Sequence, residues 1–282
     1  METIYTNLLG NVNINICLIA DIHFSEKYNI KLFDKIISNI KTHKPNYICV
    51  LGDTLDRSDV EDYQYINILY DFFNELSKMS KVIISLGNHD VVIRKNKKHI
   101  YRYPSKFINN LKSINNIIVL DNEIFEDNDI RFIGYTQGFE SLHIEDGFEN
   151  DIINEVSKLT NNIDNRKYNI LLSHNPLYLS KDEVYNNINN FDKINLVLSG
   201  HTHNGMLPNI IKTNNLLISP NKIWFTKNGR GHYKKNKTDF IVTGGVVKLS
   251  KAAKIFHIFN ALFSPNIDYI KVELQHEREI NS

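Results

Sequence analysis

The sequence is poor in cysteine, glycine and proline. Its two cysteines, Cys17 and Cys49, each lie within an apolar run, so we expect two buried thiols in a reducing compartment rather than a disulfide framework. With 12 Gly and 6 Pro among 282 residues, the chain holds little material for linkers. It has no internal repeat and no low-complexity segment, and we predict a single domain over residues 1–282.

Long hydrophobic runs and an excess of charge are absent as well. No stretch approaches the ~18 apolar residues of a membrane-spanning helix, and the first residues, METIYTNLLGN, lack the basic and apolar regions of a secretory signal. We therefore expect a cytoplasmic protein. The 33 Lys and Arg nearly balance the 32 Asp and Glu, which disfavours nucleic acid as a partner because nucleic-acid-binding proteins usually carry a strong positive field.

Five short apolar runs each end abruptly in a polar cluster. Runs of this length without alternation are typical of strands buried on both faces, as in a sheet covered by helices. They span residues 15–20, 47–51, 82–86, 169–173 and 195–199, and they are followed by Asp21, Gly52, Gly87, His174 and Gly200.

Segments with helical spacing of apolar residues lie between the first three of these runs. Apolar residues follow the i, i+3, i+4, i+7 pattern in two segments, with Phe33, Ile36, Ile37 and Ile40 in one and Leu69, Phe72, Phe73 and Leu76 in the other. Further along we predict strands at 117–120 and 130–135, a helix near 148–161, and strand-like runs at 215–225, 238–243 and 268–274. These patterns favour an α/β fold with mixed sheets and outer helices.

The polar clusters carry seven candidate metal ligands. In open α/β sheets the reactive site lies at the carboxyl ends of the strands, where loops converge. The candidates there are Asp21, His23, Asp53, Asn88, His174, His201 and His203. Seven ligands are too many for one ion but suit two ions that share a bridging carboxylate, so we infer a binuclear centre. Nitrogen and oxygen donors without a thiolate fit two divalent ions of Mn, Fe, Zn, Co or Ni better than Ca.

These motifs resemble the calcineurin-like metallophosphoesterase superfamily, and more closely its small bacterial branch. The matching motifs, over residues 15 to about 205, are Asp21-x-His23, Gly52-Asp53-x-x-Asp56, Gly87-Asn88-His89-Asp90, His174 and Gly200-His201-x-His203. The resemblance implies a double β-sandwich of mixed sheets flanked by helices. It also implies one metal on Asp21, His23, Asp53 and His203 and the other on Asp53, Asn88, His174 and His201, with Asp53 as the bridge. Residues 206–282 match no motif, and we expect them to complete the sheets and to shape specificity.

The hypothesis for function is hydrolysis of phosphate mono- or diesters. Two cations about 3.5–4 Å apart can hold a hydroxide for in-line attack and clamp the phosphate oxygens. His89, next to a ligand, is placed to act as general acid or to stabilise a phosphate oxygen. By resemblance Asp56 orients His89, although a loop cap for the following helix is the alternative. Arg57 is either a bidentate phosphate contact or an exposed loop arginine.

Two basic segments bear on the substrate, which we expect to be a small phosphate ester. Residues 94–106 hold six basic and no acidic residues, and residues 222–254 hold nine basic and one acidic; both either flank an anion-binding crevice or are solvated loops. Three aromatic residues lie among the basic residues of the second segment: Trp224, Phe225 and Tyr233. Their side chains either stack on a substrate ring or belong to the core. The apolar segment 253–263 is either a buried helix or a peripheral membrane contact.

Two other functions stay open at this stage. One is a binding or scaffold protein that kept the fold and lost catalysis, against which the complete ligand set and His89 argue. The other is a nuclease, which the near-neutral charge disfavours. The sequence does not specify an oligomeric state.

Overall fold

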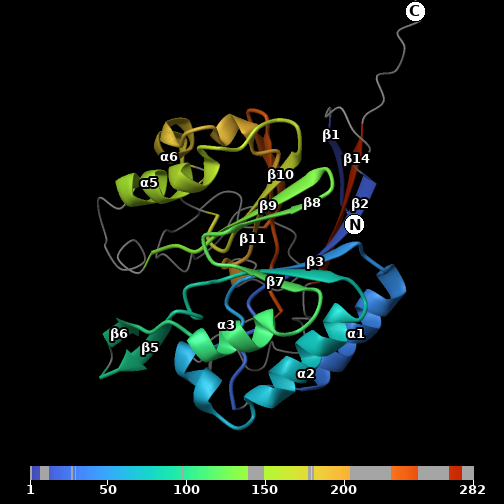
Figure 1. The fold of residues 1–282 in the computed structure, drawn as a ribbon, viewed down its shortest axis with the longest axis vertical. Helices are drawn as coiled ribbons and strands as arrows, with labels where there is room; N and C mark the ends of the chain where they lie inside the picture. Colours follow the sequence, from blue (N-terminus) through green and yellow to red (C-terminus); the bar gives the residue numbers. More distant parts are fainter. Residues whose placement is uncertain are drawn as a thin grey trace, which may run out of the picture.

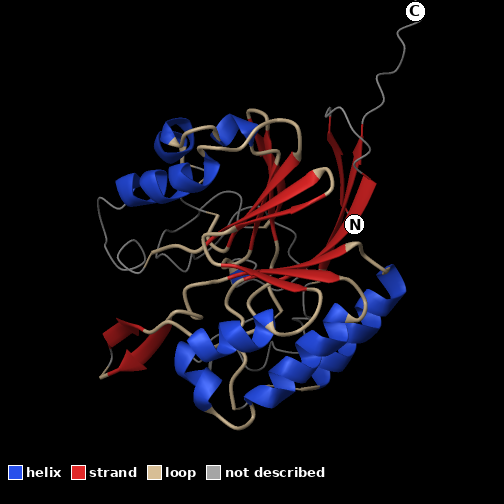
Figure 2. Cartoon of the chain, viewed as in Figure 1, coloured by secondary structure: helices blue, strands red, loops and turns tan. Residues whose placement is uncertain are grey.

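Two β-sheets lie in the middle of the structure and helices cover their outer sides (Figures 1 and 2). The computed structural model describes residues 2–6, 13–26, 28, 30–96, 98–138, 149–176, 179, 181–203, 230–246 and 267–274. No helix within these ranges is both long enough and apolar enough to cross a membrane.

The first sheet has the strand order β1-β14-β2-β3-β4-β7. Its strands are β1 (Glu2–Thr6), β2 (Asn13–Ile19), β3 (Tyr47–Leu51), β4 (Lys81–Ser85), β7 (Ile117–Leu120) and β14 (Asp268–Leu274). Strands β2, β3, β4 and β7 run parallel, β14 is antiparallel to β2, and β1 is parallel to β14. The carboxyl ends of four strands therefore share one edge.

The second sheet also has six strands, in the order β12-β13-β11-β10-β9-β8. Its strands are β8 (Ile124–Asp127), β9 (Ile130–Tyr135), β10 (Tyr168–Ser173), β11 (Leu196–Ser199), β12 (Gly231–Lys235) and β13 (Thr238–Val242). The four central strands are parallel and the two edge strands antiparallel. A separate two-stranded hairpin, β5 (Val92–Lys95) with β6 (Lys98–Tyr101), joins neither sheet.

Helices form the outer layers. The first sheet is covered by α1 (Lys31–His43), α2 (Ile66–Ser77) and α3 (Ser105–Lys112), and the second by α5 (Glu149–Thr160) and α6 (Asp182–Asn187) (Figure 1). Two short 3-10 helices, η1 (Ser58–Asp62) and η2 (Phe191–Lys193), lie in connections.

Three apolar cores separate the four layers. Along β2, Cys17 and Ile19 pack toward the helices, whereas Ile16 and Leu18 pack toward the other sheet. Strands buried on both faces need apolar side chains at every position, which explains their uninterrupted apolar runs. The predicted α/β class and double β-sandwich flanked by helices are confirmed.

Most predicted elements are present. The expected helix near 148–161 is α5, and the runs at 238–243 and 268–274 are β13 and β14; the run at 215–225 lies outside the described residues. The sequence pattern did not predict the β5–β6 hairpin or α3, because basic residues dominate segment 94–106. Both cysteines are free and buried, as expected, and burial raises the pKa of Cys17 to about 12.

The core between the sheets should dominate stability. Ile170 on β10 is 0% exposed and packs between the sheets, whereas Ile124 on β8 is 43% exposed. We expect Ile170→Ala to lower the free energy of unfolding by about 2–5 kcal/mol because it opens a cavity, and Ile124→Ala to change it by less than about 0.5 kcal/mol. Urea unfolding measures both, and equal losses would contradict a packed interface between the sheets.

Candidate metal centre

The loops that carry the predicted ligands have unusual backbone conformations. Five residues adopt the left-handed region, with φ of 54° at Asp21, 47° at His23, 51° at Asp53, 69° at His201 and 47° at His203. This region is uncommon for residues other than glycine, and Asp, Asn and His tolerate it best. Such strain clusters at functional sites when the surrounding structure enforces it.

Main-chain hydrogen bonds enforce this geometry. The N–H of Asp21 donates to the carbonyl of Gly52 at 3.1 Å, and that of His23 donates to the carbonyl of Asp53 at 2.9 Å. The N–H of His201 donates to Oδ2 of Asp21 at 3.1 Å across 180 residues of sequence. The loops after β2, β3 and β11 are thereby held against one another.

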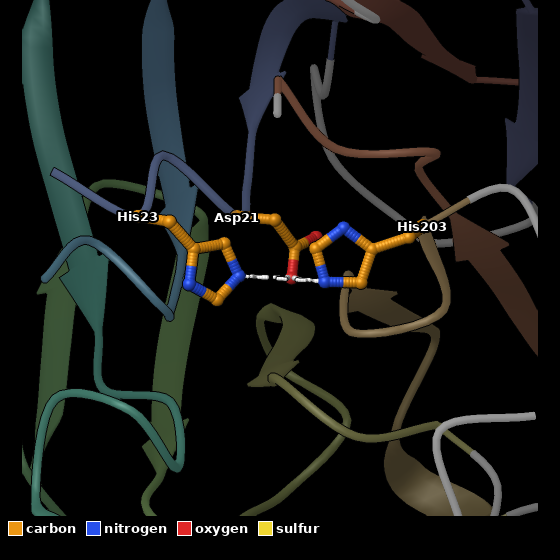
Figure 3. A group of neighbouring side chains, drawn as sticks. All are labelled: Asp21, His23 and His203. Atoms are coloured by element: carbon orange, nitrogen blue, oxygen red, sulfur yellow. Dashed lines mark hydrogen bonds and ion pairs between the residues drawn. The ribbon is translucent and has the colours of Figure 1, made fainter. Parts of the chain in front are cut away.

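A first cluster consists of Asp21, His23 and His203 (Figure 3). The Nε2 atoms of the two histidines lie 3.4 Å apart, and Nε2 of His203 lies 3.5 Å from Oδ1 of Asp21. Figure 3 shows both imidazoles directing a nitrogen toward the carboxylate. One carboxylate and two imidazole nitrogens therefore converge on one point.

A second cluster consists of Asp53, His174 and His201. Nε2 of His174 lies 3.1 Å from Oδ2 of Asp53 and 3.2 Å from Nδ1 of His201. The other nitrogen of His174, Nδ1, faces the carbonyl of Leu51 at 2.6 Å. A carbonyl only accepts, so Nδ1 carries the hydrogen and Nε2 is the atom available to a metal.

Asp53, a member of the second cluster, also lies close to the first. Its Oδ2 is 3.6 Å from Nε2 of His23 in the first and 3.1 Å from Nε2 of His174 in the second. Its Oδ1 accepts the main-chain N–H of His89 at 2.8 Å. This is the position that a carboxylate shared by two ions would need.

The residues present fit divalent cations. Oδ1 of Asp21 and Oδ1 of Asn88 are buried and have no hydrogen-bond partner among the described residues, although a buried polar atom without a partner costs about 1–3 kcal/mol. Asn88 and His174 line the same pocket. A bound cation would satisfy these oxygen atoms, which lack hydrogen-bond donors, and the imidazole nitrogens that face one another beside them.

Buried charges in this pocket shift one another's pKa values. Burial alone would lower the pKa of His174, but the Asp53 carboxylate and its hydrogen bond outweigh burial and raise the pKa to about 10. Burial acts to raise the pKa of Asp53, yet the imidazoles of His174 and His89 hold it well below its ordinary value. Burial, and after it the charge of His89, lowers the pKa of His23 well below its ordinary value.

His89 lies beside the first cluster, edge-on to the ring of His23 at 4.6 Å between centroids. Its Nδ1 donates to the main-chain carbonyl of Asp56 at 2.8 Å. The direct contact is thus the carbonyl and not the carboxylate that the resemblance implied, and Oδ1 of Asp56 lies 3.9 Å from Nδ1 of His23 instead. Because η1 has no side-chain cap, the alternative role of Asp56 as a helix cap does not hold.

Arg57 already has a carboxylate partner. Its Nε donates to Oδ1 of Asp59 at 3.1 Å, and about a third of both side chains is exposed. A phosphate contact by Arg57 stays a prediction that would require this pair to open.

Two residues near the centre were not singled out from the sequence. Asp90, fully buried, accepts the N–H groups of Leu55 at 2.8 Å and Gly87 at 2.8 Å, which ties the Asp53 and Asn88 loops together. Gly245, at φ +74°, lies so close that a Cβ there would be 2.7 Å from Oδ2 of Asp21. Asp90 belongs to the Gly-Asn-His-Asp motif, but no sequence signal marks Gly245, because it follows β13 far beyond the motifs.

Several basic residues in the described part of the two basic segments pair with carboxylates. Arg102 pairs with Glu61 and Asp62 at 3.1 and 2.5 Å, and Lys235 pairs with Asp182 at 2.8 Å. Tyr233 stacks on the buried Phe240 with 5.0 Å between ring centroids. Of the two roles expected for Tyr233, packing against the core is therefore the one observed. Trp224, Phe225 and segment 253–263 lie outside the described residues.

Comparison with known proteins identifies the family. The model of the calcineurin-like phosphoesterase family matches residues 14–205, and the chain belongs to this family. A solved crystal structure resembles it with a TM-score of 0.50 at 15% identity, covering 83% of this chain and 91% of that one; this likeness concerns the fold alone.

Two bacterial relatives share about a quarter of the sequence. An uncharacterized metallophosphoesterase of Campylobacter jejuni is 24% identical over 69% of this chain and 45% of its own length. The uncharacterized metallophosphoesterase YkuE of Bacillus subtilis is 24% identical over 73% of this chain and 64% of its own. The chain thus matches less than two thirds of the length of either relative.

The position of Asp53 can be tested by metal analysis. We expect Asp53→Asn to lose ions from both clusters because a neutral amide is a poor bridge between two dications. The matched control, Asp59→Asn, removes the same charge from a residue whose side chain is 35% exposed and should keep the wild-type metal content. Metal per chain is measured by mass spectrometry after loading, and two ions per chain in Asp53→Asn would refute the bridge.

Metal binding should also release protons. With a pKa of about 10, His174 is protonated at pH 8, and it must lose that proton to coordinate. We expect about one proton per chain from this residue, and affinity that rises with pH toward 10. Calorimetry in two buffers of different ionisation enthalpy measures the release; His174→Asn should release about one proton fewer, and an unchanged count would exclude His174.

Proposed function

We propose that this chain is a metal-dependent phosphoester hydrolase with two divalent cations. Asp21, His23 and His203 would hold one ion; Asn88, His174 and His201 would hold the other. Asp53 would contact both. The observation that carries this proposal is the carboxylate of Asp53, one oxygen of which faces a histidine of each cluster.

The donor set supports ions such as Mn, Fe, Zn, Co or Ni, which accept imidazole and carboxylate ligands together. When bound, a pair of such ions acts as a Lewis acid toward phosphate oxygens and lowers the pKa of water. The chain's own residues do the rest: they hold the ions, orient the ester and supply or withhold protons.

His89 is the residue we assign to the leaving oxygen. Its Nδ1–H is used by the carbonyl of Asp56, so Nε2 is the nitrogen left to donate a proton or hydrogen bond. Its backbone is held by Asp53 at 2.8 Å, so the imidazole keeps a defined position beside the metal ligands. That rigidity favours a general acid or a donor to a phosphate oxygen.

Kinetics with simple esters test this function. A manganese-loaded sample should hydrolyse an aryl phosphate monoester, diester or cyclic ester, and His89→Ala should lower kcat about 10²–10⁴-fold with metal content kept. His43→Ala is the control, since His43 stacks on Tyr269 at 4.0 Å, away from the site, and should leave kcat unchanged. No turnover of any ester by the wild type would favour a binding protein, and unchanged turnover in His89→Ala would remove His89 from the reaction.

A further inference from the structure

A small pocket opens beside the second cluster. Asn88 and His174, which would hold the second ion, both line this pocket. The other lining residues lie at or just beyond the carboxyl ends of three strands, β4 of the first sheet and β9 and β10 of the second. A phosphate bound by that ion would have the pocket as its immediate neighbour, so a substituent on the phosphate can extend into it.

The pocket limits the size of such a substituent. About 10 Å³ of it is open to the centre of a water molecule, which is room for about one water. With the space at its mouth, about 230 Å³ is free of described protein atoms, less than the roughly 300–1,000 Å³ of pockets for drug-sized ligands. A group of a few non-hydrogen atoms fits here, whereas a nucleobase or a lipid chain would require the walls to move apart.

Two hydroxyl groups of the lining are held by the protein itself. Tyr135 is 3% exposed, and its hydroxyl donates to Oε2 of Glu155 on α5 at 2.7 Å. The hydroxyl of Ser173 donates to the main-chain carbonyl of Asn175 at 3.3 Å. A hydroxyl has one hydrogen to donate, so these two residues shape the pocket and do not donate to a ligand.

The described residues that line the pocket include no Lys, Arg, Asp or Glu. Burial, and after it the charge of Glu155, raises the pKa of Tyr135 well above its ordinary value, so its phenol stays neutral. A carboxylate or a second phosphate would lose its hydration here without a basic side chain to pair with, which is costly. The lining therefore favours an uncharged substituent.

Amide side chains supply the polar part of the lining. Gln137 follows β9 and Asn175 follows β10, and these strands are neighbours in the second sheet. An amide both donates and accepts hydrogen bonds, as an alcohol hydroxyl does. Leu86 and the ring of Tyr135 add apolar surface for the carbon atoms that carry such hydroxyls. Asn175 is 6% exposed and Gln137 is half-buried, so Gln137 is the amide more open to a ligand.

We propose that this pocket binds a small, uncharged, hydroxylated substituent of the scissile phosphate, and that Gln137 selects it by hydrogen bonding to a hydroxyl. The substrate class is then a phosphate ester of a short polyhydroxy alcohol of about the size of glycerol. This inference rests on the proposed hydrolase function, because it takes the scissile phosphate to lie at the metal centre.

Equilibrium binding tests the pocket without turnover. Calorimetry on the manganese-loaded full chain uses phosphonates, whose carbon–phosphorus bond resists hydrolysis. Three of them have four-carbon chains that differ only in their polar groups: 3,4-dihydroxybutylphosphonate, butylphosphonate and 3-carboxypropylphosphonate. Phenylphosphonate adds a planar ring to the comparison.

Two variants separate the pocket from the rest of the surface. Gln137→Met removes the amide and nearly keeps the length of the side chain. Gln64→Met makes the same change at an exposed residue between η1 and α2, outside the pocket. Thermal unfolding and metal content per chain establish that both variants are folded and loaded.

We expect the wild type to bind the dihydroxybutyl probe more tightly than the other three. Gln137→Met should raise the Kd of that probe about threefold to tenfold, the loss of one hydrogen bond. The same variant should leave the Kd of butylphosphonate within about twofold, because this probe has no hydroxyl. Gln64→Met should change neither value.

The inference is overturned if the carboxylate or the ring is preferred, or if the hydroxyls give no gain over butylphosphonate. It is also overturned if no phosphonate binds, or if Gln137→Met weakens both chains equally or not at all. Hydrolysis of aryl phosphates by the wild type is judged separately. Turnover without selection of the hydroxylated probe refutes the role of the pocket alone, whereas absence of any turnover refutes the proposed function.

Discussion

The negative charge of Asp53, buried where loops from both sheets meet, is the constraint on which the rest of the site depends. Burial by itself would favour the neutral carboxyl group. The surrounding imidazoles of His174 and His89 keep it ionised, and the main chain of His89 hydrogen bonds to its Oδ1. The positive charge of these imidazoles compensates the buried carboxylate, as a cation bound at the same place would.

The centre exists only where the two sheets meet. Loops after β2, β3 and β4 of the first sheet bring Asp21, Asp53 and Asn88, whereas loops after β10 and β11 of the second bring His174 and His201. The apolar core between the sheets therefore sets the distance between oxygen and nitrogen donors. Small residues allow the close approach: a Cβ on Gly87 would lie 2.3 Å from the backbone nitrogen of Asp53, so a larger residue there would push the loops apart.

Strain is concentrated at the same place. The left-handed backbone of Asp21 and His203 is less favourable than an ordinary strand end, and hydrogen bonds between loops maintain it. The cost is offset by the packed sheets on either side. Asp and His tolerate this backbone better than most residues and also ligate metals, so one choice of residue meets both needs.

The sequence by itself determined the strands, their polar ends and the residue types of the centre, because uninterrupted apolar runs and motif spacing are local features. It predicted mixed sheets flanked by helices and seven metal ligands at the strand ends, and six of these seven lie in the two clusters. Only the tertiary structure decided that His89 contacts the carbonyl of Asp56 and that Gly245 closes on Asp21. These outcomes depend on the direction of side chains and on hydrogen bonds between distant loops, which packing sets and local sequence does not encode.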